Sequence, residues 1–283
     1  MDSNKVWFVT GASKGLGLTL IQELLKTGHR VAATSRNVEA LQKAVGVEGS
    51  ERFLPLQVSL VNECHVKSAI ESALAAFGTI DVVVNNAGYG QFGTLEELSD
   101  QEARQNFDIN VFGALNVIRR VMPHFRDKRS GVIFNIGSIG GYTGGFPGWG
   151  IYCATKFAVA GFTEALSAEV KPFGVHAVAV YPGYFRTSFL SEGSMVLPNS
   201  PIEAYEAARN SQALHQDQIN GNQEGDPVKA AAVLMQIAGV PQPPLHLFLG
   251  QDAYDLAGEK MASVQKDLQC WKELTVATGF AHA

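Results

Sequence analysis

The stretch VWFVTGASKGLGLTLIQELLKTG, residues 6–28, decides the fold. An apolar run at 6–10 enters a glycine-containing turn, and a helix-like segment over 15–28 follows at once. The chain repeats this order, with strand-like runs at 31–35, 53–58, 80–88, 131–138, 175–183 and 243–250 and helix-like segments at 63–78, 101–125 and 151–174. The runs lack clean polar alternation, which predicts strands buried on both faces. The sequence therefore predicts an α/β fold with a doubly wound parallel sheet of about seven strands flanked by helices.

The composition excludes several classes of protein. Of the 283 residues, 46% are hydrophobic and 17% charged, so we expect one ordered single domain over 1–283. A net charge of −5 without a basic block argues against nucleic-acid binding. No apolar run has the length of a membrane span, and the start does not read as a signal peptide. Three distant cysteines (Cys64, Cys153 and Cys270) and no HxxH or HExxH pattern predict a reduced, cytoplasmic protein without a metal site.

The turn TGASKGLG, residues 10–17, is a candidate phosphate-binding loop. Gly11, Gly15 and Gly17 stand in GxxxGxG spacing directly before a helix. Glycine lets the backbone approach a pyrophosphate, and the helix N-terminus offers free N–H groups. An ordinary strand-to-helix turn is the alternative interpretation.

Two cations near this loop favour NADP(H) over NAD(H). Lys14 lies inside the loop, and Arg36 follows the second strand, where a dinucleotide site meets the adenosine ribose. Ser35 and Arg36 offer donors and positive charge in place of an acidic residue, which suits a 2′-phosphate. Each cation alone is a surface charge in the alternative interpretation.

The segment GWGIYCATK, residues 148–156, carries a phenol and an ammonium four residues apart. On a helix this spacing puts Tyr152 and Lys156 on one face, so the lysine can stabilise a phenolate and lower the pKa of Tyr152. Tyr152 is then a candidate general acid or base. Ser138, after the fifth strand, can donate a second hydrogen bond to the substrate oxygen. An exposed helix pair is the alternative.

Six motifs occur in the order of one known family: TGASKGLG, NNAG (85–88), DINVFG with Asn110, NIGSIGG with Ser138, YCATK, and PGYFRT (182–187). From residue 5 to about 250 the chain resembles the classical short-chain dehydrogenases/reductases (SDR). The closest subgroup is similar to 17β-hydroxysteroid dehydrogenases and carbonyl reductases. The resemblance implies a Rossmann-like NAD(P)-binding domain that transfers a hydride between nicotinamide and a carbonyl or alcohol, with NADPH as the expected donor.

The resemblance also implies roles for individual residues. The family's catalytic tetrad maps onto Asn110, Ser138, Tyr152 and Lys156, with the lysine also holding ribose hydroxyls and the asparagine holding a water. The cofactor-binding residues implied are Gly11, Ser13, Lys14, Gly15, Leu16, Gly17, Ser35, Arg36, Val58, Asn86, Ala87, Gly88, Asn110, Tyr152, Lys156, Pro182, Gly183 and Thr187.

Two positions depart from the family pattern. Gln57 stands where the family commonly has an aspartate beside the adenine, so one adenine contact is in doubt. Ser138 and Tyr152 are one residue further apart than is usual, and the glycine-rich run 140–150 can absorb the difference.

The substrate site is expected in the loops after the fifth and sixth strands. The predicted pocket consists of Ser138, Ile139, Trp149, Tyr184, Phe185 and Phe189, with Tyr142, Phe146, Met195 and Leu197 as further candidates. So apolar a set predicts a hydrophobic ketone or aldehyde, or the corresponding alcohol. Residues 186–225 form a long excursion that predicts a substrate lid, with a lid helix over 201–216.

Two alternatives remain at this point. One is a 3-oxoacyl-carrier-protein reductase, although no basic surface for an acidic carrier is evident. The other is a non-catalytic NADP(H)-sensing module, which an intact tetrad disfavours. By analogy with the family, the helices at 101–125 and 151–172 build a homodimer or homotetramer.

Overall fold

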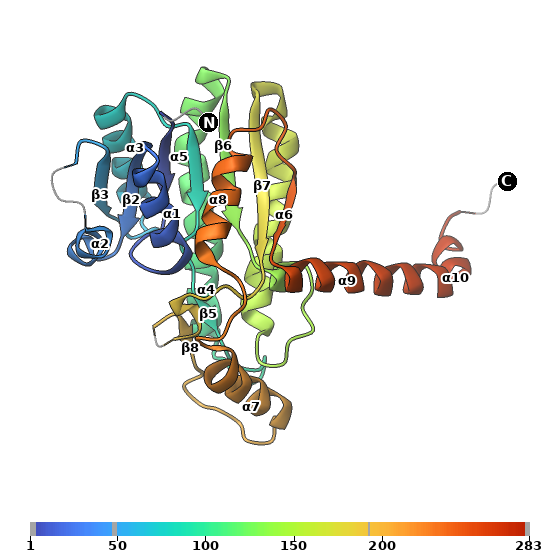
Figure 1. Cartoon of the computed structure of the whole chain (residues 1–283). Coiled ribbons are helices and arrows are strands. Elements are labelled where there is room, and N and C mark those ends of the chain that lie inside the picture. The colour runs from blue at the N-terminus through green and yellow to red at the C-terminus, as the bar shows by residue number, and fades with distance from the viewer. Residues whose placement is uncertain (1–3, 47–49, 192, 281–283) are drawn as a thin grey trace.

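The large sheet of the molecule is parallel and has seven strands. The computed structural model describes residues 4–46, 50–191 and 193–280, so residues 1–3 at the start and residue 192 in the excursion lie outside it. The strand order is β3-β2-β1-β4-β6-β7-β9, which confirms the predicted fold class (Figure 1). The strands are β1 (Val6–Val9), β2 (Arg30–Ser35), β3 (Phe53–Gln57), β4 (Val82–Asn85), β6 (Gly131–Ile136), β7 (Val175–Pro182) and β9 (His246–Leu249).

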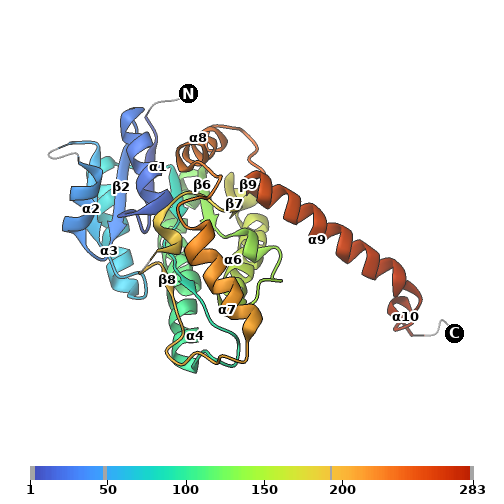
Figure 2. The same ribbon diagram turned by 60° about the horizontal axis from the view of Figure 1, so that its bottom comes forward.

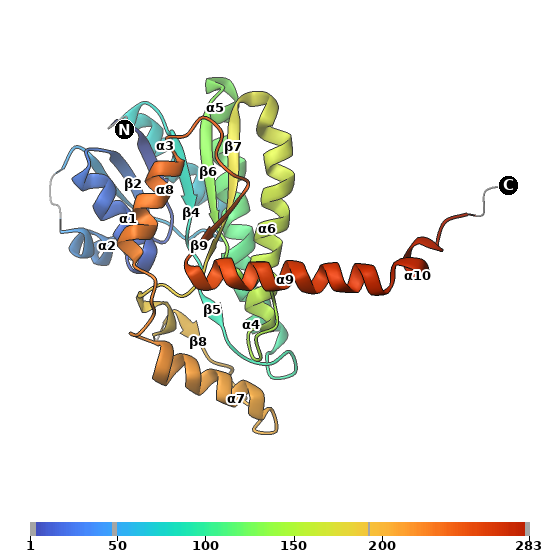
Figure 3. The ribbon, with the colours of Figure 1, turned by 45° about the vertical axis from the view of Figure 1, so that its right-hand side comes forward.

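Helices cover both faces of this sheet (Figures 1 and 3). On one face lie α1 (Gly15–Lys26), α2 (Val38–Val45) and α8 (Pro227–Ile237). The other face carries α3 (Glu63–Phe77), α5 (Gly113–Lys128) and α6 (Gly150–Val170), while α4 (Asp100–Phe107) lies beyond the end of the sheet beside α6 and β5. Successive residues of one strand serve opposite cores: Trp7 stacks on Phe134 beneath α1, while Phe8 packs with Ile133 beneath α5. Burial on both faces explains the unbroken apolar runs in the sequence.

The segment predicted as one helix over 101–125 is divided in the structure. A π-helical turn over Asp108–Phe112 joins α4 to α5. The π turn widens the backbone by one residue and places Asn110 on its buried side, where it is 2% exposed. The π turn therefore determines where the Asn110 side chain lies.

Several elements were not predicted from the sequence. The strands β5 (Gly90–Gln91) and β8 (Met195–Val196) pair in a separate two-stranded sheet, too short for any periodicity to reveal. Beyond β9 the chain forms α9 (Gln251–Cys270) and α10 (Lys272–Val276), and α9 extends away from the body (Figure 3).

The 186–225 segment crosses the carboxyl ends of the strands, and its helix comes forward in Figure 2. It contains α7 (Glu206–Ala213), which a π-helical turn continues over Leu214–Ile219. The prediction that the helix starts at Pro201 is wrong. The backbone amides before α7 do not bond within a helix. Those of Asn199 and Ile202 donate instead to the carboxylates of Glu102 (3.0 Å) and Glu97 (2.7 Å), respectively.

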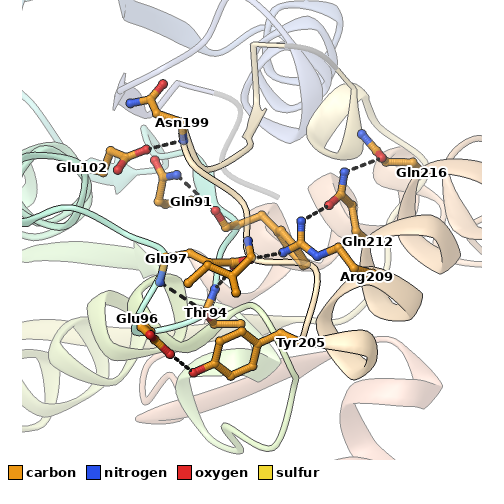
Figure 4. A network of polar contacts seen from close by, with 12 residues as sticks. Gln91, Thr94, Glu96, Glu97, Glu102, Asn199, Tyr205, Arg209, Gln212 and Gln216 are labelled. Atoms are coloured by element: carbon orange, nitrogen blue, oxygen red, sulfur yellow. Dashed lines mark hydrogen bonds and ion pairs between the residues drawn. The ribbon is translucent and has the colours of Figure 1, made fainter.

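Glu97 is the buried anchor of this segment (Figure 4). Its carboxylate accepts hydrogen bonds from the amides of Thr94 and Ile202, each at 2.7 Å, and from Arg209 on α7 at 2.6 Å. Burial raises the pKa of this carboxyl, but the amide bonds and the Arg209 charge outweigh burial and leave the pKa lowered. The carboxylate therefore stays ionised near neutral pH and holds the 186–225 segment to the 94–102 loop.

We expect Glu97→Gln to loosen this attachment. Hydrogen bonds to a charged group contribute about 1.5–3 kcal/mol, so amide exchange at Thr94, Ile202 and α7 should accelerate by about 10- to 100-fold. Hydrogen exchange followed by mass spectrometry measures this. The matched control is Glu96→Gln, because Glu96 is exposed and bonds Tyr205 of the same segment. Equal protection in both variants would refute the role of Glu97.

Candidate active site

The glycine-containing loop lies between β1 and α1 and leaves the N-terminus of α1 open. Gly11 and Gly15 have φ values of +64° and +60°, a region that favours glycine. A Cβ on Gly11 would lie 2.6 Å from the Cα of Ala87, and one on Gly17 would lie 2.5 Å from Nδ2 of Asn86. Lys14 at the helix N-cap makes no side-chain cap hydrogen bond. The backbone amides at the start of α1 are therefore available to an anion that approaches the loop closely.

Two cations stand beside this loop. The charge of Arg36, together with the larger effect of burial, lowers the pKa of Lys14. Lys14 Nζ donates to the carbonyl of Gly193 at 3.2 Å. Within the residues that the structure describes, neither cation has an ion-pair partner. Gln57 donates to the carbonyl of Arg36 at 3.2 Å and so holds the end of β3 to the end of β2.

Tyr152 and Lys156 lie on the inner face of α6 and are 8% and 5% exposed. The Nζ atom of Lys156 donates to the carbonyl of Ile136 at 2.9 Å and lies 5.6 Å from the centre of the Tyr152 ring. A Cβ on Gly140 would lie 3.5 Å from Ser138 Oγ and 3.8 Å from Cε1 of Tyr152. The alternative of an exposed helix pair is excluded, since phenol, ammonium and hydroxyl converge inside the protein.

Burial dominates the electrostatics of this cluster. It raises the pKa of Tyr152, and a hydrogen bond with Ser138 opposes that rise. It lowers the pKa of Lys156 to about 8. The expectation that the lysine lowers the pKa of Tyr152 is not met in the chain alone, because burial raises that pKa and the Lys156 ammonium, 5.6 Å from the ring centre, does not contribute to the shift. The phenol is consequently held protonated at neutral pH, as a proton donor requires.

Asn110 connects the π turn to the loop after β4 and to α6. Its Oδ1 accepts from the amide of Tyr89, and its Nδ2 donates to the carbonyl of Tyr89 and to Oγ1 of Thr155, all at 3.0 Å. Gly88 sits so close that a Cβ there would lie 3.0 Å from Asn110 Oδ1 and 3.5 Å from Lys156 Nζ. The amide thus fixes the loop after β4 against α6 beside the lysine.

A single cavity of about 890 Å³ joins these parts. All but two of the predicted site residues line it, from the glycine loop through Ser35, Arg36 and Val58 to Tyr184, Phe185, Thr187 and Phe189. Gly17 and Asn110 lie behind its wall. Among the further pocket candidates Phe146 lines the cavity, whereas Tyr142 packs between Tyr181 and Phe248, and Met195 and Leu197 are not in the lining.

Sequence reasoning missed several polar residues of the cavity. Gln91, His215 and Gln223 line it. Nδ1 of His215 donates to the carbonyl of Ser211, so Nε2 of the neutral ring accepts a 2.8 Å hydrogen bond from the hydroxyl of Tyr184. Cys153 also reaches the wall, and burial raises its pKa to about 11. No spacing rule links these residues, because β5, the π turn after α7 and the loop before α8 meet only in the fold.

The donor set fits a nicotinamide dinucleotide. Uncapped amides of α1 and two unpaired cations suit its phosphates, and the cavity falls within the range of about 300–1,000 Å³ that small-molecule sites occupy. The described residues contain no cluster of side chains able to hold a metal ion. In the same residues, no helix is both long and apolar enough to cross a bilayer.

Comparison with known proteins agrees with this geometry. The family model described as short chain dehydrogenase matches residues 5–194. Oxidoreductase BOA17 of Botryotinia fuckeliana is 34% identical over 97% of this chain and 99% of its own length. A 3-ketodihydrosphingosine reductase of Bacteroides thetaiotaomicron is 34% identical over 87% of this chain and 88% of its own. The crystal structure of a short-chain dehydrogenase from Streptomyces avermitilis has a TM-score of 0.90 and 34% identity, covering 98% of this chain and 100% of that one.

Two further solved structures contain the cofactor. A 3-ketoacyl-(acyl-carrier-protein) reductase from Brucella melitensis holds NADH (25% identity, TM-score 0.69, covering 86% and 96% of the two chains). A short chain dehydrogenase from Burkholderia cenocepacia holds NADP (26% identity, TM-score 0.72, covering 95% and 98%). With its nicotinamide-type site and these relatives, the chain belongs to the short-chain dehydrogenase family and is an oxidoreductase that acts on CH–OH groups with a nicotinamide cofactor.

Proposed function

We propose that this protein is an NADPH-dependent carbonyl reductase, and in reverse an alcohol dehydrogenase, for hydrophobic ketones or aldehydes. One observation carries the proposal: a buried, protonated phenol, Tyr152, opens on the cavity that begins at the glycine loop. When bound, the nicotinamide supplies or accepts the hydride.

Each residue of the tetrad has a distinct task in this scheme. Tyr152 donates its proton to the substrate oxygen as negative charge develops there, and Ser138 donates a second hydrogen bond to the same oxygen. The Lys156 ammonium stabilises the phenolate left behind. Asn110 is a positioning residue, because its side chain bonds Tyr89 and Thr155 and so sets the loop after β4 against α6. In the alcohol direction the same groups act in reverse.

The cofactor preference rests on Lys14 and Arg36. Two cations that repel each other and lack an anion are stabilised by a dianionic 2′-phosphate. A free ribose hydroxyl would leave that repulsion in place. The remaining cofactor contacts that we propose are those set out from the sequence, and all of them except Gly17 and Asn110 line the cavity.

The substrate class follows from the aromatic residues in the cavity lining. Trp149, Tyr184 and Phe189 are apolar surfaces, and the rings of Trp149 and Phe189 lie 5.5 Å and 5.7 Å from that of Tyr152. Within the described residues, Trp149 Nε1 and Gln223 Nε2 are buried donors without a partner. We therefore favour an apolar carbonyl compound that also carries a hydrogen-bond acceptor. The name of the Bacteroides relative, 3-ketodihydrosphingosine reductase, is consistent with a ketone substrate.

We extend the proposal to three properties of the whole protein. The 186–225 segment acts as the lid of the single domain 1–283, excluding water during hydride transfer. The protein works in the cytoplasm. It assembles as a homodimer or homotetramer, and Phe112 and Phe157, exposed on the helices 101–125 and 151–172, would be covered in that assembly.

We expect Tyr152→Phe to reduce turnover by about 100-fold or more, since a positioned general acid contributes roughly 10²–10⁴-fold. NADPH oxidation is followed with apolar ketones, aldehydes and oxoacyl thioesters. Each compound is compared with an analogue that carries an additional hydrogen-bond acceptor. NADPH binding, read by fluorescence, should be retained in the variant and serves as the control. Full activity of the variant would exclude Tyr152 as the acid. If the wild type turned over only thioesters, the carrier-protein alternative would hold, and no turnover at all would favour a sensing module.

We expect Arg36→Asp to move cofactor preference from NADPH toward NADH, because the carboxylate repels the 2′-phosphate and accepts from a ribose hydroxyl. The ratio of kcat/KM for the two cofactors should fall by about 10-fold or more, given about 1.5–3 kcal/mol for a hydrogen bond to a charged group. Arg52→Asp, directly before β3 and outside the cavity lining, is the control for the same charge change elsewhere. An unchanged ratio in Arg36→Asp would contradict the assignment.

A further inference from the structure

The C-terminal helix α9 leaves the body of the protein after its first two turns. At its base Ala253 and Ala257 are buried against Ile139, and Asp252 accepts a 2.7 Å hydrogen bond from the amide of Tyr184. From Gly258 to Phe280 every residue is exposed. The free part of α9 extends roughly 20 Å into solvent, at 1.5 Å per residue (Figures 1 and 3).

Large apolar side chains follow one side of this free helix. Met261, Val264, Leu268 and Trp271 are 56%, 42%, 55% and 61% exposed. They continue the line of Tyr254 and Ala257, with steps of three and four residues that alternate throughout. That is the 3.5-residue repeat of a helix that packs along another helix. We call Met261, Val264, Leu268 and Trp271 the α9 stripe.

A free helix of this length is marginal in water, so the α9 stripe needs a cover. A membrane surface fits poorly, because three lysines stand against five carboxylates over 251–273, while helices that lie on membranes carry an excess of basic residues. Of the residues that the structure describes, those of the same chain's body cover only the first two turns of α9. The cover must come from another protein surface.

We propose that the α9 stripe pairs antiparallel with the same stripe of a second copy of this chain. With the two-fold axis near residue 266, Met261 lies opposite the partner's Trp271, and Val264 lies opposite the partner's Leu268, so every stripe residue is matched. Parallel pairing would bring both bodies to one end, where each helix already packs on its own body through Ala253 and Ala257. Antiparallel pairing places the two bodies at opposite ends. The inference concerns assembly and does not depend on the proposed reaction.

The first test compares molar mass by light scattering during gel filtration. We expect Met261→Glu/Leu268→Glu to halve the mass of the wild-type assembly at the same concentration. Ser263→Glu/Gln269→Glu, with the same charge change off the stripe, should keep the wild-type mass. Because the stripe lies away from the described residues of its own body, each variant should still show a cooperative melting transition, which verifies that it is folded. A stripe variant with the wild-type mass, or a wild type that is a monomer, would overturn the proposal.

The second test reads the orientation by disulfide formation, in a chain whose Cys64 and Cys270 are replaced by serine. Met261→Cys/Trp271→Cys should form disulfide-linked dimers on oxidation. Met261→Cys alone should not, since antiparallel pairing leaves the two sulfur atoms roughly 15 Å apart, ten residues at 1.5 Å each. Efficient linkage of the single variant would overturn the antiparallel arrangement.

Discussion

Burial of the Lys156 ammonium is the constraint on which the rest of the site depends. A charged amine in the interior is costly unless it is hydrogen-bonded, and here the carbonyl of Ile136 at the end of β6 accepts a 2.9 Å hydrogen bond from it. That bond holds α6 against the carboxyl end of the sheet. Further along α6, Thr163 accepts a 2.9 Å hydrogen bond from Asn135 of β6. The helix that carries Tyr152 is thus fixed to the strand that ends before Ser138.

The second consequence of this burial is the division of labour between phenol and ammonium. The same low polarity that makes Lys156 easier to deprotonate makes Tyr152 harder to ionise. A reductase needs a neutral acid before proton transfer and a stabilised phenolate after it. A lysine close to the ring but not bonded to the hydroxyl meets both needs. The mutual distance of the two groups therefore matters more than either pKa alone.

The sequence predicted the parts of this account that depend on local order. Buried strands, the glycine loop and Tyr152–Lys156 each have a short-range pattern, and parallel strands bring their carboxyl ends to one edge. Contacts between distant segments have no such pattern. Nothing in the sequence indicated that Glu97 would bond Ile202 or that His215 would bond Tyr184. The helix α9 lies beyond the last predicted strand. The pKa of Tyr152 was misjudged because the spacing indicates a neighbouring charge but not the desolvation that raises this pKa.

The pH dependence of carbonyl reduction tests the role of the buried lysine most directly. Burial lowers the pKa of Lys156 to about 8, so its charge is lost as pH rises through that value, while Tyr152, with its raised pKa, stays protonated. We predict that kcat/KM of the wild type falls above pH 8, and that Lys156→Arg, which keeps its charge, shows no such fall relative to its own value at pH 7. A wild-type profile that is flat from pH 7 to 10, or an identical fall in the arginine variant, would contradict the account.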